Sequence, residues 1–159
     1  MAAQTMISSF LKTLSTYKRI GIDSMCFIYQ FEGNRMYGKL VRQLFLLLQA
    51  RKLTSVTSVL TLAEILAFER LQKDRALFEQ TKAKLLTVPS LHIIPVDEVI
   101  CETAAILKYQ YALALPDALQ LATALLSKLE AFVSNDRRLH KVKEIPVLLL
   151  NDFLPSYVL

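Results

Sequence analysis

Four acidic residues of this sequence lie in apolar surroundings, where a carboxylate needs a chemical reason. Asp23 ends a short apolar segment, and Glu64 interrupts a run of leucine, alanine and isoleucine. Asp117 opens another apolar segment directly after a proline, and Asp136 follows an apolar stretch by two polar residues. An ionised carboxylate that is buried alone costs several kcal/mol. These four residues therefore differ from most of the other acids, which lie among lysines and arginines.

The four acids are far apart in the chain, so only the fold can bring them together. Asp23, Asp117 and Asp136 are expected at strand ends or helix starts, and the carboxyl ends of parallel strands form the ligand crevice of an open sheet. Oxygen ligands without His or Cys suit hard ions such as Mg²⁺ or Mn²⁺. Such an ion would offset the mutual repulsion that raises the pKa of neighbouring carboxylates. A metal site is thus one interpretation of the four residues.

Each acid also has a simpler structural interpretation. Asp117 favours the positive end of a helix dipole, and Asp136 after Ser-Asn is typical of a turn or an N-cap. Glu64 could pair with a neighbouring lysine or arginine. Asp23 is the hardest to explain in this way, because an aspartate between a strand and an apolar helix has no local partner. Composition and spacing alone leave both interpretations open.

The elements that must position these acids alternate along the chain between helical and strand patterns. Ser58, Asp74 and Asp97 are expected as helix N-caps, and Pro116 fits the first turn of a helix. This alternation predicts one α/β domain, with a central parallel sheet of about five strands and helices on both faces. Predicted helices cover 7–17, 36–50, 58–70, 74–87, 97–111 and 116–130, and predicted strands cover 20–23, 53–57, 92–96, 131–133 and 146–150.

The composition excludes several classes of protein. With 53% hydrophobic residues, three glycines and five prolines in 159 residues, the chain is not disordered and can build a full core. Cys26 and Cys101 cannot form a disulfide framework and are expected in the core of a protein from a reducing compartment. The segment between Lys108 and Lys128 is apolar, but a proline and an aspartate at its middle argue against a membrane span. The N-terminus lacks the pattern of a secretion signal, so we expect a cytoplasmic protein without membrane contact.

The net charge of +5 favours a polyanionic partner. Arg137, Arg138, Lys141 and Lys143 directly follow the fourth acid, and we expect them to contact phosphate groups. A solvated helix face is the alternative explanation of this basic run. Tyr29, just past the first acid, is a candidate for stacking on a base of a single strand.

The acids and their flanks resemble the PIN-domain ribonucleases, above all the VapC-type toxins of toxin–antitoxin pairs. Gly21-Ile22-Asp23-Ser24 is similar to the end of the family's first strand, and residues 59–65 are similar to its second acidic motif. Leu115-Pro116-Asp117-Ala118-Leu119 is similar to the third motif, and Val133-Ser134-Asn135-Asp136-Arg137 to the fourth. The last two motifs together are the most specific part. The resemblance covers about residues 18–155 in order.

This resemblance implies a PIN-like three-layer fold over residues 18–159, preceded by an N-terminal helical extension over residues 1–17. It implies a ribonuclease that depends on Mg²⁺ or Mn²⁺ and hydrolyses RNA phosphodiester bonds. The residues that would bind the metal and carry out the cleavage are Asp23, Glu64, Asp117 and Asp136.

The resemblance also implies supporting residues and partners. Ser24, Ser134 and Asn135 would orient the carboxylates or a water by hydrogen bonds. The expected partners are an RNA substrate, a cognate antitoxin protein and a second copy of the chain. For this homodimer, the leucine-rich segment 36–50 and the N-terminal helix are the expected contact surfaces.

Two alternatives remain within the same family, and one lies outside it. The chain could be a solitary PIN nuclease of RNA processing, or a degenerate PIN domain that binds without cutting. The family often has an asparagine two residues after its first aspartate, and Met25 stands there instead, which affects how Asp23 is oriented rather than metal binding. A phosphotransfer domain with Asp23 as its nucleophile would need a second aspartate at that same position.

Overall fold

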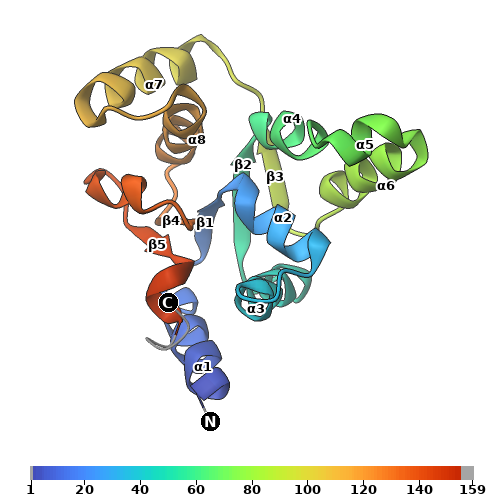
Figure 1. The fold of residues 1–159 in the computed structure, drawn as a ribbon. Helices are drawn as coiled ribbons and strands as arrows, with labels where there is room; N and C mark the ends of the chain where they lie inside the picture. Colours follow the sequence, from blue (N-terminus) through green and yellow to red (C-terminus); the bar gives the residue numbers. More distant parts are fainter. Residues whose placement is uncertain (1, 155–159) are drawn as a thin grey trace.

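Five short strands form the centre of the molecule: β1 (Arg19–Ile22), β2 (Thr54–Ser58), β3 (Leu91–Ile94), β4 (Ala131–Ser134) and β5 (Val147–Leu149). The computed structural model describes residues 2–154 of the chain. The strands form one sheet in the order β3-β2-β1-β4-β5, and every neighbouring pair is parallel (Figure 1). The predicted α/β fold with about five parallel strands is confirmed.

The helices of the described chain are α1 (Ala2–Leu14), α2 (Ser24–Glu32), α3 (Gly38–Gln49), α4 (Leu60–Leu66), α5 (Glu69–Lys73), α6 (Arg75–Leu86), α7 (Glu98–Tyr111) and α8 (Leu115–Leu126), with the 3-10 helices η1 (Arg137–Lys141) and η2 (Leu150–Phe153). They cover both faces of the sheet (Figure 1). On one face, α1, α2 and α3 pack with Ile20 and Val133, and on the other, α7 and α8 pack with Val56 and Phe132. The predicted three layers are therefore present.

The predicted helix over 58–70 is wrong in its bounds. Strand β2 continues to Ser58, whose hydroxyl oxygen accepts a hydrogen bond from the backbone N–H of Leu60 at 3.3 Å. The helical segment then breaks at Phe68, whose extended backbone (φ −62°, ψ 132°) separates α4 from α5. The predicted caps Asp74 and Asp97 do accept hydrogen bonds from the first turns of α6 and α7, at 3.0 and 2.9 Å.

Gly21 leaves room for the aromatic ring of Phe132 on the neighbouring strand. It pairs with Phe132 in the register of β1 and β4. A Cβ atom at residue 21 would lie 2.4 Å from Cδ2 of Phe132, which is closer than two carbon atoms can approach. Glycine is therefore favoured here, because a larger residue would force the buried ring of Phe132 to move.

Helix α1 is part of the hydrophobic core. Its side chains of Met6, Phe10 and Leu14 are buried in the same cluster as β1 and α3. The ring of Phe10 meets the ring of Phe153 edge-on, with 4.9 Å between their centroids. Leu40, Leu44 and Leu48 of α3 also lie in this core, so the helices that suggested a dimer interface bury much of their apolar surface within one chain.

The two cysteines have different environments. Cys26 is buried in the core, as predicted, whereas Cys101 is exposed. The prediction for Cys101 is wrong because α7 turns this residue away from Ile100, Ala104 and Leu107, which face α8. Among residues 2–154, no helix has the length and apolar character needed to cross a membrane.

We predict that Phe10→Ala destabilises the whole domain. Removing a fully buried aromatic side chain typically costs about 3–5 kcal/mol. Urea denaturation should show this loss in one cooperative transition. The control Lys12→Ala lies on the exposed side of α1 and should change the free energy of unfolding by less than about 0.5 kcal/mol. Equal effects of the two substitutions would mean that α1 is not part of the core.

Candidate active site

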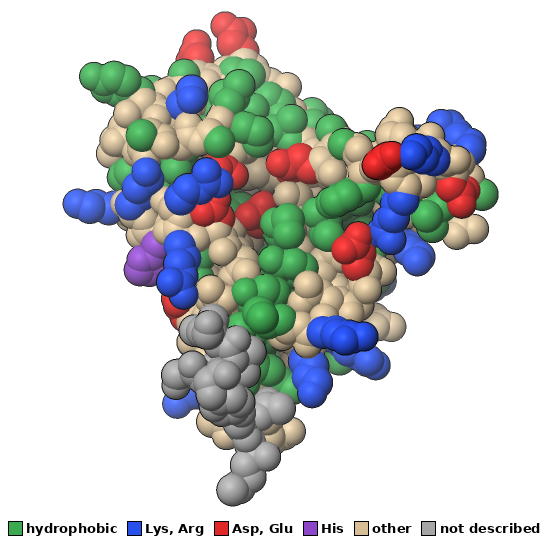
Figure 2. Space-filling model, in the orientation of Figure 1, with side chains coloured by type: hydrophobic (Ala, Val, Ile, Leu, Met, Phe, Trp, Pro, Cys, Tyr) green, Lys and Arg blue, Asp and Glu red, His purple; other side chains and the backbone are tan. Residues whose placement is uncertain are grey.

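The four predicted acids come from elements that meet at the carboxyl edge of the sheet. Asp23 follows the last residue of β1, and Asp136 lies two residues beyond β4, the neighbouring strand. Glu64 lies on α4, which follows β2, and Asp117 lies in the first turn of α8. Figure 2 shows acidic side chains gathered around a hollow in the middle of this face. The topology thus brings together residues that are far apart in the chain.

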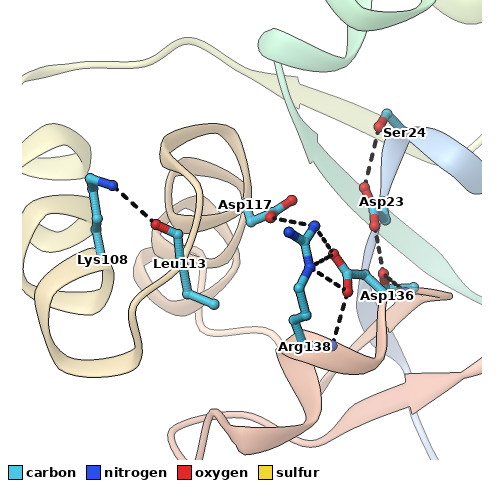
Figure 3. Close-up of polar contacts among 8 residues, drawn as sticks. Asp23, Ser24, Lys108, Leu113, Asp117, Asp136 and Arg138 are labelled. Atoms are coloured by element: carbon cyan, nitrogen blue, oxygen red, sulfur yellow. Dashed lines mark hydrogen bonds and ion pairs between the residues drawn. The ribbon is translucent and has the colours of Figure 1, made fainter.

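Asp23 is the most buried of the four, with 8% of its surface exposed. Its Oδ2 accepts a hydrogen bond from the Ser134 hydroxyl at 2.5 Å, and its Oδ1 accepts one from the Ser24 hydroxyl at 3.2 Å (Figure 3). The Ser134 oxygen in turn accepts the backbone N–H of Asp136 at 3.1 Å. Ser134 therefore couples the first and the fourth acid through one hydroxyl group.

The carboxylates also affect one another electrostatically. Burial raises the pKa of Asp23, and the negative charge of Glu64 raises it further, against the hydrogen bond from Ser134. The pKa of Asp117 is raised by burial and then by the charges of Asp23 and Asp136. Such mutual repulsion indicates that the side chains share one site rather than separate surroundings.

Arg138 joins two of the acids. Its Nε donates to both carboxylate oxygens of Asp136 at 3.0 and 2.9 Å, and its Nη2 lies 3.5 Å from Oδ2 of Asp117 (Figure 3). This guanidinium lowers the pKa of Asp136, and the two carboxylates raise the pKa of Arg138. A phosphate bound to Arg138, as predicted, would thus compete with Asp117 and Asp136 for the same guanidinium group. Asp136 also accepts the backbone N–H of Arg138 at 2.9 Å, so it is the predicted N-cap as well.

Glu64 has a partner that the sequence analysis missed. The amide nitrogen of Gln120 lies 3.4 Å from Oε2 of Glu64 and donates to the Thr61 hydroxyl at 2.7 Å. The Gln120 carbonyl accepts the backbone N–H of Ser58 at 3.1 Å. This buried glutamine therefore ties α8 to the end of β2. Its signal in the sequence is a polar residue one helical turn after Asp117. Within residues 2–154, Glu64 makes no ion pair with a lysine or arginine.

The remaining predicted residues lie around the site without contacting the acids through hydrogen bonds. Asn135 donates to the Tyr29 hydroxyl at 3.5 Å and accepts the backbone N–H of Asn151 at 3.1 Å. These bonds link β4, α2 and η2, and the support of a carboxylate or a water by Asn135 stays a prediction. Arg137, Lys141 and Lys143 are exposed, and the charge of Lys141 contributes to the lowered pKa of Asp136.

The chemistry of this donor set fits a hard divalent cation. It consists of carboxylate oxygens, and the pKa values of Asp23 and Asp117 are raised first by burial and then by the negative charge of neighbouring carboxylates. As the side chains stand in residues 2–154, no three Asp, Glu, His or Cys residues are arranged to hold a metal ion. Arg138 instead supplies the positive charge between Asp117 and Asp136.

An α/β sheet with acids at its carboxyl edge is shared by many proteins, and comparison identifies the family. Residues 20–145 match the model of the PIN domain, so the chain belongs to the PIN-domain family. Helix α1 lies before the matched region. No protein with a curated description matches the chain.

Solved structures share the fold over most of the chain. A toxin–antitoxin complex from Klebsiella pneumoniae is 24% identical with a TM-score of 0.62, covering 82% of this chain and 97% of that one. VapBC2 from Rickettsia felis, bound to a DNA fragment from its promoter, is 14% identical with a TM-score of 0.62, covering 82% and 98%. DNA-bound VapBC from Salmonella typhimurium is 15% identical with a TM-score of 0.61, covering 84% and 98%.

We predict opposite effects of neutralising Asp23 and Asp136 in the absence of divalent metal. The raised pKa of Asp23 means that its carboxyl favours folding at low pH and loses this contribution as pH rises through the raised pKa. Asp23→Asn should therefore be more stable than wild type at neutral pH. Asp136 has a lowered pKa, so its contribution is present at neutral pH and is lost on acidification. Asp136→Asn should be less stable at neutral pH.

Urea denaturation in metal-free buffer, from about pH 2 to about pH 7, measures both effects. The stability difference between Asp23→Asn and wild type should shrink as pH falls towards about 4, whereas the difference between Asp136→Asn and wild type should shrink only below about pH 4. A loss of stability in Asp23→Asn at neutral pH would contradict the unfavourable burial of this carboxylate.

Proposed function

We propose that the chain is a metal-dependent endoribonuclease. The observation that carries the proposal is the convergence of Asp23, Asp117 and Asp136, with Glu64 in electrostatic reach, at one edge of the sheet of a PIN domain. Exposed basic residues beside these acids suit a polyanionic substrate. This combination favours cleavage of a nucleic acid over binding alone.

In this proposal, Asp23, Glu64, Asp117 and Asp136 hold one or two Mg²⁺ or Mn²⁺ ions. The bound metal supplies a water of lowered pKa and neutralises charge on the phosphate oxygens. Ser134 fixes the orientation of the Asp23 carboxylate, and Gln120 orients Glu64.

In this proposal, Arg138 also contacts a phosphate of the substrate. It neutralises Asp117 and Asp136 in the arrangement seen here, and its exposed guanidinium is suited to bidentate contact with a phosphate. A substrate phosphate and the two carboxylates therefore compete for the same cationic group. Arg137, Lys141 and Lys143 would hold neighbouring phosphates.

We predict that Asp117→Asn lowers RNA cleavage at least about 100-fold, because loss of a metal ligand costs no less than loss of the groups that orient one. The assay follows a fluorescent RNA in Mn²⁺ or Mg²⁺, with EDTA abolishing the signal. The matched control is Asp74→Asn, since asparagine keeps the cap on α6 far from the site. If wild type and Asp117→Asn are equally inactive on every RNA tried, the nuclease proposal fails and a binding module is left.

We further propose that this nuclease is the toxin of a toxin–antitoxin pair. The similar structures from Klebsiella pneumoniae, Rickettsia felis and Salmonella typhimurium support it, since they are toxin–antitoxin or VapBC complexes. An apolar groove of about 580 Å³ also lies along α4, the helix that carries Glu64. The groove residues are Val59, Leu60, Leu62, Ala63, Leu66, Ala67, Gln72 and Phe78. An antitoxin that fills this groove would bind beside the acids and block them.

We predict that Ala67→Arg weakens binding of the antitoxin at least about tenfold, because a charged side chain cannot enter an apolar contact without losing its hydration. The partner to test is the small protein encoded next to this chain, measured by co-purification and titration. Ala83→Arg, on the exposed side of α6, is the control. Equal binding of the antitoxin by both variants would exclude the groove as its binding site. If no protein encoded next to this chain binds it, a solitary nuclease is favoured.

The homodimer and the cytoplasmic location also remain proposals. Because α1 and α3 bury most of their apolar side chains in the core, a dimer through these helices would use their remaining exposed surface, such as Leu46. Sedimentation of the purified chain would determine its oligomeric state.

A further inference from the structure

A pocket lined by basic residues lies where α2 passes into α3. Its volume is about 380 Å³, and its three charged side chains are Arg35, Lys39 and Arg42. All three are exposed. The wall is completed by Tyr29, Gln30, Gly33, Asn34 and Gly38. Neither the catalytic proposal nor the antitoxin groove uses these residues.

The charges of this pocket lack an acidic partner in the described chain. Within residues 2–154, Arg35, Lys39 and Arg42 make neither ion pairs nor side-chain hydrogen bonds. Three cations around one pocket repel one another, so an anion bound between them would be stabilised.

The position of these cations at the start of α3 is also electrostatically unfavourable. The first turn of α3 has no acidic residue, and its N-cap Tyr37 makes no side-chain capping bond. Lys39 lies in this first turn, and Arg42 follows one turn later. Cations are unfavourable at the positive end of a helix dipole. This arrangement opposes the stability of the helix, as expected of residues that serve a ligand.

The pocket is connected to the acidic site. The Tyr29 ring, which forms part of its wall, stacks on Tyr37 with 4.8 Å between centroids. The Tyr29 hydroxyl accepts the side-chain N–H of Asn135, the residue before Asp136. Helix α2, nine residues long, begins directly after Asp23 and ends at the pocket, which corresponds to about 13 Å.

Basic groups therefore flank the acids on two sides. Arg137, Lys141 and Lys143 follow β4, while the pocket lies at the far end of α2. Figure 2 shows Lys and Arg side chains on both sides of the acidic hollow, including a group where α2 passes into α3. A polyanionic strand crossing the hollow would be repelled by the carboxylates at its centre and attracted at both flanks.

We propose that Arg35, Lys39 and Arg42 bind a backbone phosphate of the RNA, a few nucleotides away from the bond at the acidic site. This proposal rests on the proposed nuclease function and extends it to how the substrate is held. The pocket then acts as an anchor that sets which stretch of a single strand lies across Asp23 and Asp117. It contacts phosphate groups, so it contributes affinity rather than recognition of bases.

The test compares two triple variants with equal loss of charge. The pocket variant carries Arg35→Gln, Lys39→Gln and Arg42→Gln. The control carries Lys12→Gln, Lys52→Gln and Lys128→Gln, of which the last two precede β2 and β4 and so lie towards the amino edge of the sheet. Binding of a fluorescent single-stranded RNA is measured by anisotropy in EDTA, which prevents cleavage, over salt from about 50 to about 200 mM.

We expect the pocket variant to bind at least about tenfold more weakly at the lower salt. The slope of log K against log salt should become shallower by about 0.7, because the pocket holds one phosphate and each lost phosphate contact on a single strand accounts for about 0.7. The control should keep nearly the wild-type affinity and slope. Thermal melting should show no loss of stability in the pocket variant, since the substitutions relieve repulsion.

Equal affinity and equal slope for the two variants would overturn the proposal. So would a result in which the pocket variant keeps its RNA affinity but no longer binds a polyglutamate peptide, because the pocket would then be a site for an acidic protein segment. Cleavage by wild type is assayed separately in Mn²⁺. If wild type does not cleave RNA but its RNA binding depends on the pocket, only the nuclease proposal is wrong. If wild type cleaves RNA but its RNA binding does not depend on the pocket, only the pocket proposal is wrong.

Discussion

The arrangement of this molecule depends on keeping one carboxylate at the end of its central strand, largely out of water. Asp23 is buried, and its charge is opposed both by desolvation and by Glu64. Hydroxyl groups of Ser24 and Ser134 stabilise it, and Ser134 comes from the neighbouring strand. The parallel pairing of β1 and β4 therefore brings Ser134 within reach of Asp23, and Gly21 leaves room for the Phe132 ring between the same two strands. Core packing and site chemistry are thus joined at the same pair of strands.

The cations around the acids are of two kinds. Arg138 neutralises Asp117 and Asp136 directly. The exposed side chains of Arg35, Lys39 and Arg42 make no ion pair within residues 2–154. In the proposed function, an RNA strand would meet these unpaired cations before it reaches Arg138. It would then be bound first by groups that lose little on binding, and the ion pairs of Arg138 would be disturbed only once the strand is in place.

Local patterns predicted much of this structure, and the failures have physical causes. The strands, the caps Asp74 and Asp97, and the burial of Cys26 followed from apolar periodicity and capping chemistry. The break at Phe68 did not, because no glycine or proline marks it. The contacts of Gln120 with Glu64 and of Arg138 with Asp117 could not be predicted either, since they join different elements and exist only in the fold. Convergence of the acids followed from the topology of parallel sheets, but not the identity of the groups that neutralise them.

The contact between Phe10 and Phe153 has a consequence for how the domain forms. It joins the first helix to the last described turn, so almost the whole sequence lies within the loop that it closes. Contacts between such distant residues form late in folding, because closing a long loop costs less chain entropy once the intervening chain is compact. Helix α1 and η2 therefore depend on each other, because they cover the same part of the core through Phe10 and Phe153. A chain shortened at either end would expose this apolar surface to water.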